Sequence, residues 1–381
     1  MRAHNERLVL SLVRHEPMAK SDIARITGLS AQTVSVIMRS LEADGLLLRG
    51  EPIRGRIGQP SVPMHLNPEG AFFFGVKIGR RSVDLIRTDF LGRIVDHRHR
   101  TYPYPTHHAA VAFIGEALPQ MIAAMPAPQR DRVAGLGIAM PFQMWNWAQY
   151  VGAPASEMAA WRDRDIQSEI AAICPFPVYV QNDATAACSA ELVFGTGERP
   201  QNFIYFYIGY FVGGGVVING QLYTGPTGNA GALGSMPVPG PDGAMRQLIQ
   251  VASMASLERY LAQAGHASDT LWNTPPAWSV PDDIRDRWLD EVARGIAHAS
   301  LSSTAVLETE AVLIDGWMPD DVRARLVDRT VQALDQLDFA GIDRPRVRPG
   351  TVGDHARALG AASIPLSQRY LVDPAAILKE S

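Results

Sequence analysis

Residues 71–95 read AFFFGVKIGRRSVDLIRTDFLGRIV, and this stretch decides the fold class. An apolar run breaks at Gly79 into a short turn that carries two arginines, and a second strand-like run begins at Ser82. Apolar, β-branched and aromatic residues bounded by glycine turns are typical of strands joined by tight connections. Together with residues 92–102, the stretch predicts a three-strand meander whose first strand ends near Lys77.

The rest of the body alternates strand and helix signals, which indicates an α/β fold. Expected strands lie at 132–140, 176–181, 202–209, 212–220 and 311–317, and expected helices at about 108–125, 183–195, 243–264, 283–304, 319–335 and 354–362. A meander followed by helix, strand and helix occurs twice in this order. We therefore expect two related lobes, residues 69–195 and 196–381, with a ligand bound between them.

Residues 1–68 form a separate module with the pattern of a helix-turn-helix. Two short amphipathic helices are expected on either side of the turn TGLS at 27–30, with Ser21 and Ser30 as caps. Apolar residues of the second helix repeat at helical spacing, at Val34, Ile37, Met38 and Leu41. A β-hairpin wing is expected to follow.

Polar residues of this module are the candidate DNA contacts, because short polar and basic side chains can reach base edges and phosphates. The expected contacts on and before the second helix are Ser30, Gln32, Thr33, Ser35 and Arg39. Those expected at the wing tip are Arg54, Arg56 and Gln59. A helical dimerisation or packing module is the competing interpretation.

Composition limits the other classes of function. The chain has 381 residues and a net charge of −4, yet residues 1–68 hold nine Lys or Arg and six acids, a basic head on an acidic body. Cys174 and Cys188 are the two cysteines, too few for a disulfide framework or a multi-cysteine zinc site. No apolar run approaches the ~18 residues of a membrane span. A cytoplasmic protein is expected.

Six stretches together resemble the ROK (repressor, open reading frame, kinase) family, in its repressor branch with an N-terminal winged helix-turn-helix. They are residues 75–95 (GVKIGRRSVDLIRTDFLGRIV), 135–141 (GLGIAMP), 181–195 (QNDATAACSAELVFG), 208–238 (IGYFVGGGVVINGQLYTGPTGNAGALGSMPV), 255–261 (ASLERYL) and 357–362 (RALGAA). The resemblance implies a two-lobed actin-like (ribonuclease H-like) sugar-kinase fold behind the DNA-binding head.

Three nucleotide-facing motifs depart from the kinase pattern of that family. Lys77 stands where family kinases carry a carboxylate that supports metal and phosphates, and a lysine cannot ligate Mg²⁺. Tyr210 and Phe211 replace a threonine and a glycine of the second phosphate loop, and Asp315-Gly316 stands for a glycine pair that packs on adenosine. We therefore expect no enzymatic activity and no cofactor.

The sugar-facing positions are partly kept. The resemblance assigns ligand contacts to Asn182, Asp183 and Glu258, with Ser235 in place of a histidine. Asp183 as a helix cap and Glu258 as an ordinary helix glutamate are the alternatives. Ala232 and Ser235 replace the family's glutamate and histidine, and no cysteines follow, so no metal is expected. Lys77 is expected to pair with Asp183.

These patterns predict a transcription regulator, a repressor that binds a double-stranded DNA operator as a homodimer or a dimer of dimers and senses a sugar or sugar derivative. An active ROK sugar kinase with an accessory DNA-binding head is the alternative. A regulator that has lost its small ligand and responds to a protein is the third possibility.

Overall fold

The computed structural model describes residues 4–52, 62–272 and 278–372, which fall into two compact units. The first unit comprises residues 1–181 and 361–381, and the second comprises residues 182–360. Among the described helices, none is both long and apolar enough to cross a membrane.

The chain begins with three helices and a small two-stranded sheet. Gly28 ends the second helix at φ 70°, and the Ser30 side chain caps the third by accepting from the Thr33 backbone N–H at 3.1 Å. The expected cap at Ser21 is wrong, because the second helix already begins at Lys20. The elements are α1 (His4–His15), α2 (Lys20–Thr27), α3 (Ala31–Ala43), β1 (Leu47–Arg49) and β2 (Met64–Leu66).

The sheet of the first unit has the strand order β5-β4-β3-β6-β7. The predicted meander is confirmed: β3 pairs antiparallel with β4, and β4 with β5, while β6 runs parallel to β3. The strands are β3 (Phe72–Ile78), β4 (Ser82–Thr88), β5 (Ile94–Thr101), β6 (Val133–Met140) and β7 (Val178–Asn182).

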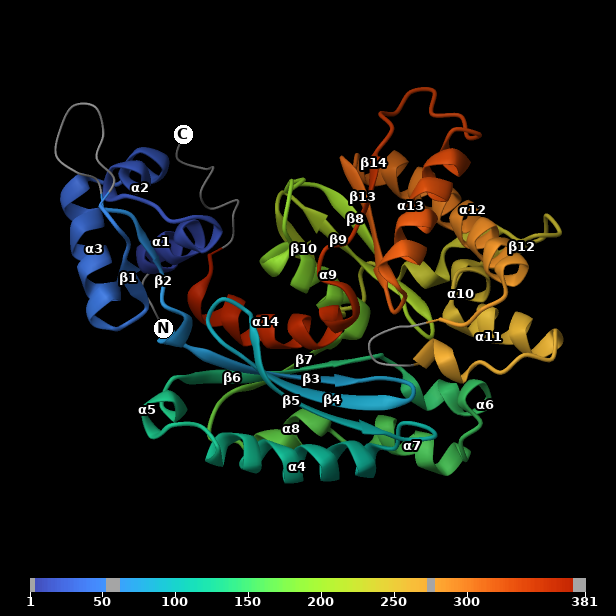
Figure 1. Cartoon of the computed structure of the whole chain (residues 1–381), viewed down its shortest axis with the longest axis horizontal. Helices are drawn as coiled ribbons and strands as arrows, with labels where there is room; N and C mark the ends of the chain where they lie inside the picture. Colours follow the sequence, from blue (N-terminus) through green and yellow to red (C-terminus); the bar gives the residue numbers. More distant parts are fainter. Residues whose placement is uncertain (1–3, 53–61, 273–277, 373–381) are drawn as a thin grey trace. The chain divides into compact units, whose positions relative to one another are not determined.

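Helices cover both faces of this sheet (Figure 1). The apolar side chains of β3 and β4 pack against those of α4 (His107–Ala123) on one face, and α14 (Ala356–Tyr370) lies on the other. A Cβ at Gly137 would lie 1.9 Å from the Ala361 carbonyl oxygen, so glycine is required where α14 meets β6. The smaller helices of this unit are α5 (Ala127–Arg130), α6 (Ala148–Val151), α7 (Ala155–Asp163) and α8 (Ile166–Ala171).

The sheet of the second unit has the order β10-β9-β8-β13-β14 and repeats the pattern of the first. β8, β9 and β10 form an antiparallel meander, and β13 runs parallel to β8 and β14. Its strands are β8 (Phe203–Ile208), β9 (Val212–Ile218), β10 (Gln221–Tyr223), β13 (Ala311–Gly316) and β14 (Arg346–Pro349). The expected α/β fold with two related mixed sheets is confirmed.

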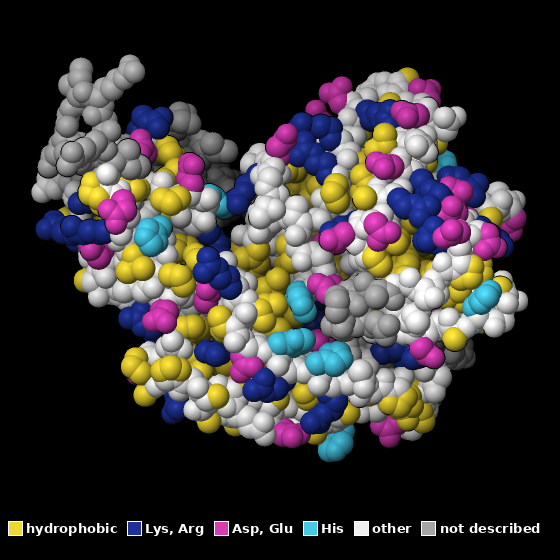
Figure 2. Space-filling model, in the orientation of Figure 1, with side chains coloured by type: hydrophobic (Ala, Val, Ile, Leu, Met, Phe, Trp, Pro, Cys, Tyr) yellow, Lys and Arg dark blue, Asp and Glu magenta, His cyan; other side chains and the backbone are white. Residues whose placement is uncertain are grey.

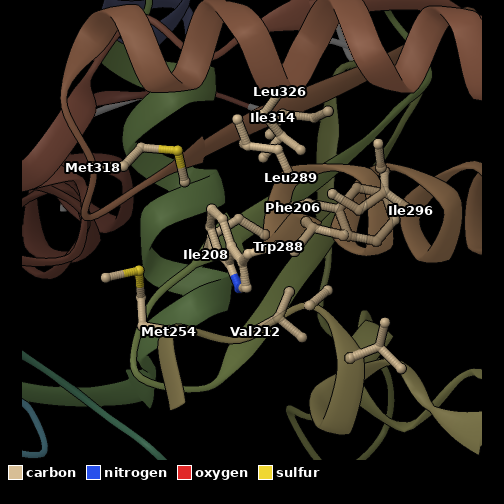
Figure 3. Close-up of a cluster of buried hydrophobic side chains, with 14 of the residues drawn as sticks. Phe206, Ile208, Val212, Met254, Trp288, Leu289, Ile296, Ile314, Met318 and Leu326 are labelled. Carbon is tan, nitrogen blue, oxygen red and sulfur yellow. The ribbon is translucent and has the colours of Figure 1, made fainter. Parts of the chain in front are cut away.

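A large apolar cluster holds the second unit together (Figure 3). Phe206 and Ile314 from the sheet meet Trp288 and Leu289 from the long helix α12, and all four are fully buried. The helices of this unit are α9 (Asp183–Phe194), α10 (Leu248–Val251), α11 (Met254–Gln263), α12 (Asp282–Leu307) and α13 (Asp320–Leu334). Such burial is the main favourable contribution to folding.

The single helix expected at 243–264 is wrong. The segment forms β12 (Met245–Gln247), which pairs with β11 (Pro237–Pro239), and then the separate helices α10 and α11. Ser253 lies at the break, where its hydroxyl donates to the Ile249 carbonyl at 2.6 Å and accepts from the Val212 backbone N–H at 2.9 Å. This bond to a distant strand is invisible to a local apolar pattern.

Candidate functional site

The turn between β3 and β4 is closed around the Lys77 side chain. Its ammonium donates to Asp84 Oδ2 at 2.8 Å and to Ser82 Oγ at 2.7 Å, and the residue is only 7% exposed. A Cβ at Gly79 would lie 2.8 Å from Lys77 Cε, so this glycine makes room for the lysine. Gly79 is therefore needed because a larger residue would collide with the Lys77 side chain.

Arg80 folds back onto the protein in the same turn. Its guanidinium donates to the carbonyl of Pro103 and to that of Val151, the latter at 3.1 Å. The Tyr102 hydroxyl lies 2.6 Å from the Gly79 carbonyl oxygen and 2.9 Å from that of Ser82. Hydrogen bonds of Arg80 and Tyr102 thus tie the β3–β4 turn to other parts of the first unit.

The glycine run 213–215 in β9 is required by close packing. A Cβ at Gly213 would lie 2.7 Å from the Ala184 Cβ, and one at Gly215 would lie 2.4 Å from the Cys188 Cβ. Helix α9 therefore sits directly against this strand. The rings of Tyr210 and Phe211, just before the run, lie 4.8 Å apart in an edge-on contact.

Asp315 is fully buried at the end of β13. Its carboxylate accepts from Arg323 Nη1 at 2.9 Å and from the Tyr205 hydroxyl at 3.0 Å. The Gly316 and Gly353 backbone N–H groups donate to it at 2.9 and 3.0 Å. Burial raises the pKa of Asp315, and the charge of Arg323 opposes that rise. The carboxylate is thus enclosed by four donors.

Asn182 and Asp183 lie at the start of α9, where Asn182 caps the helix and Asp183 forms an ion pair. The Asn182 side chain caps the helix by accepting from the backbone N–H groups of Ala184 and Thr185 at 3.1 and 3.3 Å. The alternative interpretation of Asp183 as the cap is therefore wrong. Asp183 instead accepts from Arg357 Nη1 at 3.2 Å.

Arg357 lies in the first turn of α14 with its guanidinium carbon 5.0 Å from the centre of the Tyr207 ring. Burial alone would lower the pKa of Arg357, but Tyr207 and Asp183 raise it above its ordinary value. The arginine is therefore charged. Its Nε is buried and has no hydrogen-bond partner among the described residues.

The expected pairing of Lys77 with Asp183 is wrong. Lys77 pairs with Asp84, the residue opposite it in the β3–β4 register, and Asp183 pairs with Arg357. Both partners come from the same unit as the residue they bind. Lys77 therefore has its partner on the neighbouring strand, and Asp183 has its partner on another helix of the same unit.

Glu258 on α11 is held by a neighbouring aromatic residue. Its Oε1 accepts from the Trp272 indole N–H at 2.7 Å, so it is more than an ordinary solvated helix glutamate. Ser235 ends a short 3-10 helix (Leu233–Ser235) and is exposed. All four predicted ligand residues, Asn182, Asp183, Ser235 and Glu258, lie in the second unit.

The predicted recognition helix is α3. Gln32 and Arg39 are exposed, Thr33 and Ser35 are half-buried, and Ser30 caps the helix. Arg39 Nε donates to the Ser35 carbonyl at 3.2 Å, one turn back. The wing-tip candidates Arg54, Arg56 and Gln59 lie outside the described residues.

The sequence did not reveal Arg357 and Asp84 as the ion-pair partners of Asp183 and Lys77. Arg357 is 174 residues from Asp183 along the chain, and no local pattern links the two. Asp84 could have been found, because a meander places it opposite Lys77. An acidic and a basic residue directly opposite on one face of a sheet attract each other.

Comparison with known proteins gives a family and several relatives. The model of the ROK family matches residues 73–368. The chain is 24% identical to a transcriptional regulator of Mycobacterium tuberculosis, across 96% of this chain and 85% of that one. It is 27% identical to the xylose repressor of Bacillus subtilis, across 61% of this chain and 60% of the repressor.

Solved structures show the same fold. One is a ROK family transcriptional regulator described as a homologue of the E. coli MLC protein, with a TM-score of 0.67, 19% identity, and coverage of 96% of this chain and 97% of that one. Another is a ROK family glucokinase from Streptomyces griseus, with a TM-score of 0.59, 21% identity, and coverage of 77% and 99%.

Proposed function

Because the chain belongs to the ROK family, we propose that it is a DNA-binding transcription regulator, and specifically a repressor. The observation that carries this is the helix pair α2–α3, joined by a tight turn and preceding the family domain. Relatives with the names of transcriptional regulators and repressors support it. In a homodimer, two such heads would meet the two halves of a pseudo-palindromic operator.

The α3 surface is the proposed reading head. Gln32 offers an amide that can pair with an adenine edge, and Arg39 offers a cation for a phosphate. Ser30, Thr33 and Ser35 add hydroxyl donors near the helix start, where major-groove contacts are made. The wing residues Arg54, Arg56 and Gln59 would contact the phosphate backbone or the minor groove.

The second unit is the proposed sensor of a sugar or sugar derivative. Asn182, Asp183, Ser235 and Glu258 supply the oxygen atoms that hydrogen-bond hydroxyl groups. Arg357 is charged, lies beside Asp183, and carries a buried Nε without a partner among the described residues. A guanidinium in this place favours a ligand that carries oxygen acceptors next to its hydroxyls.

Two residues, Lys77 and Asp315, support the loss of phosphoryl transfer. Transfer requires Mg²⁺ and groups that neutralise the phosphates. Lys77 offers no ligand to Mg²⁺ and already pairs with Asp84, and Asp315 adds a negative charge where the family has glycine. An active sugar kinase remains the second candidate, since Asp183 keeps the position of the family's catalytic base.

Helix α14 is the proposed link between sensor and head. In its first turn Arg357 bonds Asp183, within the second unit. Past its last turn, within the first unit, the Leu371 carbonyl accepts from Arg7 Nε at 2.7 Å and the Val372 N–H donates to Ser11 Oγ at 3.0 Å. A ligand that disturbs the Asp183 pair would act on a helix anchored to α1, and it shifts DNA affinity only if it binds the two states differently.

The test is a selection of genomic fragments by the full-length protein, followed by mobility-shift titration at several salt concentrations. We expect a selective site with steep salt dependence. Gln32→Ala and Arg39→Ala should weaken it about tenfold or more. Arg294→Ala is the control for Arg39→Ala, because it removes the same charge from an exposed position of α12, and it should change the affinity for DNA little. Fragments bound without sequence preference would contradict the proposal.

A coupled ADP-release assay with Mg·ATP and a panel of sugars tests the second candidate. The regulator proposal predicts no turnover above the rate without protein. Sustained turnover that Asp183→Asn abolishes would establish the kinase instead.

A further inference from the structure

Two histidines and one aspartate converge on neighbouring strands of the first sheet. Asp84 on β4 stands opposite His99 on β5 in the register, and His97 lies two residues before His99 on the same face. Asp84 Oδ1 lies 2.6 Å from His99 Nδ1 and 3.0 Å from His97 Nε2. The three ligand atoms all lie within 4.8 Å of one another.

Two imidazole nitrogens and one carboxylate oxygen are a ligand set that binds first-row transition-metal ions. Zn²⁺ bonds such atoms at about 2.0–2.2 Å, which puts tetrahedral ligand atoms about 3.3 Å apart. Asp84 Oδ1 lies 2.6 and 3.0 Å from the two imidazole nitrogens, closer than that value, and all three atoms lie within 4.8 Å of one another. Side-chain rotations that lengthen the two contacts of Asp84 would admit an ion.

The aspartate is held in place from its other side. Asp84 Oδ2 accepts from Lys77 Nζ at 2.8 Å, and Ser82 Oγ lies 3.4 Å away, so Oδ1 is the oxygen that faces the histidines. The ion pair with Lys77 fixes the carboxylate and leaves its second oxygen directed at the two imidazoles.

Solvent can reach the cluster. The side chains of His99 and His97 are 37% and 30% exposed, whereas that of Asp84 is 15% exposed. An ion can therefore enter from the histidine side and keep water on its remaining positions. A lysine near the carboxylate weakens attraction for a cation, and this sets a moderate affinity rather than a permanent structural site.

We propose that Asp84 Oδ1, His97 Nε2 and His99 Nδ1 form a binding site for a divalent first-row transition-metal ion such as Zn²⁺. The site lies in the first unit, whereas Ser235, which stands in place of the family's histidine, lies in the second. A bound ion would fasten the edge strand β5 to β4, next to the Lys77 turn. The competing interpretation is a hydrogen-bonded trio that binds no metal.

Titration of the full-length, tag-free protein with Co²⁺ and with Zn²⁺ tests this. We expect one ion per chain, with visible cobalt bands that report nitrogen and oxygen ligands. His97→Ala and His99→Ala should each weaken binding by about tenfold or more, as ligand loss does at such sites. His108→Ala, at an exposed histidine of α4, is the control and should bind like the parent.

Asp84→Asn keeps the shape of the side chain and should also weaken binding about tenfold or more, since the ligand charge is lost. Lys77→Met removes the nearby cation and should tighten binding several-fold, about threefold or more; a misfolded variant would not bind more tightly. Binding that survives both histidine substitutions, or a parent protein that takes up no ion at millimolar concentration, overturns the proposal.

Discussion

The end of β3 in the first unit and the end of β13 in the second are two positions where this chain departs from the kinase pattern of its family, and the two substituted side chains have opposite charge. Lys77 stands where a carboxylate is expected, and Asp315 stands where a glycine is expected. Each charge is neutralised inside its own unit, Lys77 by Asp84 and Asp315 by Arg323.

The two ion pairs differ in how much of their side-chain surface is exposed to solvent. The Asp315 side chain is fully buried, whereas Lys77 and Asp84 keep 9% and 15% of their side-chain surface. A buried carboxylate that loses its counter-charge leaves that charge unpaired at high cost, and a pair in contact with water loses less. We therefore expect substitutions in these pairs to differ in how much they lower the free energy of unfolding, with the largest loss at Asp315.

The largest effect is expected at Asp315. Asp315→Ala removes the acceptor for four donors and leaves the Arg323 cation without its buried partner. The free energy of unfolding should fall by about 3–5 kcal/mol. Urea denaturation followed by circular dichroism measures this.

Asp320→Asn is the matched control, because Asp320 also pairs with Arg323 but its side chain is 90% exposed. Its midpoint in urea should equal that of the parent. If the two substitutions had equal effects, the burial argument would be wrong.

The next effect is expected at Asp183, whose pair with Arg357 is about as buried as the pair of Lys77 with Asp84. The side chains of Arg357 and Asp183 are 12% and 14% exposed. Asp183→Asn should lower the free energy of unfolding by about 2–3 kcal/mol, since the arginine keeps its ring contact with Tyr207. Thermal unfolding checks the value, and a stabilised variant would show that the pair is strained.

A smaller effect is expected at Lys77. Lys77→Met keeps the apolar stem and removes the ammonium, so Asp84 keeps the bonds of His97 and His99. The unfolding free energy should fall by about 1–2 kcal/mol. Urea denaturation of this variant beside Asp315→Ala measures the difference. If both variants lost the same free energy of unfolding, the burial of the ion pair would not explain the effect of losing it.

The smallest effect is expected outside both positions, at the start of α3. Ser30→Ala removes the side-chain cap and should cost about 1 kcal/mol. Ser35→Ala lies inside the same helix and should be neutral or slightly stabilising. Chemical denaturation of the two variants side by side gives the difference, and equal midpoints would show that the cap contributes nothing.

Local patterns predicted most elements of the fold. The meander from β3 to β5, the capped helix α3 and the buried strands all carry short-range signals of apolar alternation, glycine and cap residues. The break at Ser253 carried none, because its cause is a bond to β9, 41 residues away. Tertiary contacts of this kind override local propensity.

The sequence suggests positions for the candidate site but does not reveal the hydrogen-bond partners of these residues. Family motifs pointed to Asn182, Asp183 and Glu258, but the bonds of Asp183 to Arg357 and of Glu258 to Trp272 join residues 174 and 14 positions apart. The alternating histidines of 96–100, DHRHR, belong to the third strand of the predicted meander. Only the register with β4 brings them to Asp84.

We propose that a sugar-kinase scaffold here senses a ligand, and that the bound ligand changes the affinity of the protein for DNA. The most direct measurement is the affinity of the full-length protein for its selected DNA site, by fluorescence anisotropy, across a panel that includes xylose, glucose and their phosphates. We expect at least one of these compounds to change the affinity tenfold or more, about 1.4 kcal/mol of coupling, and Asp183→Ala to abolish the change. An affinity that no compound alters, in a protein that converts ATP and a sugar to ADP and a sugar phosphate, would contradict the proposal.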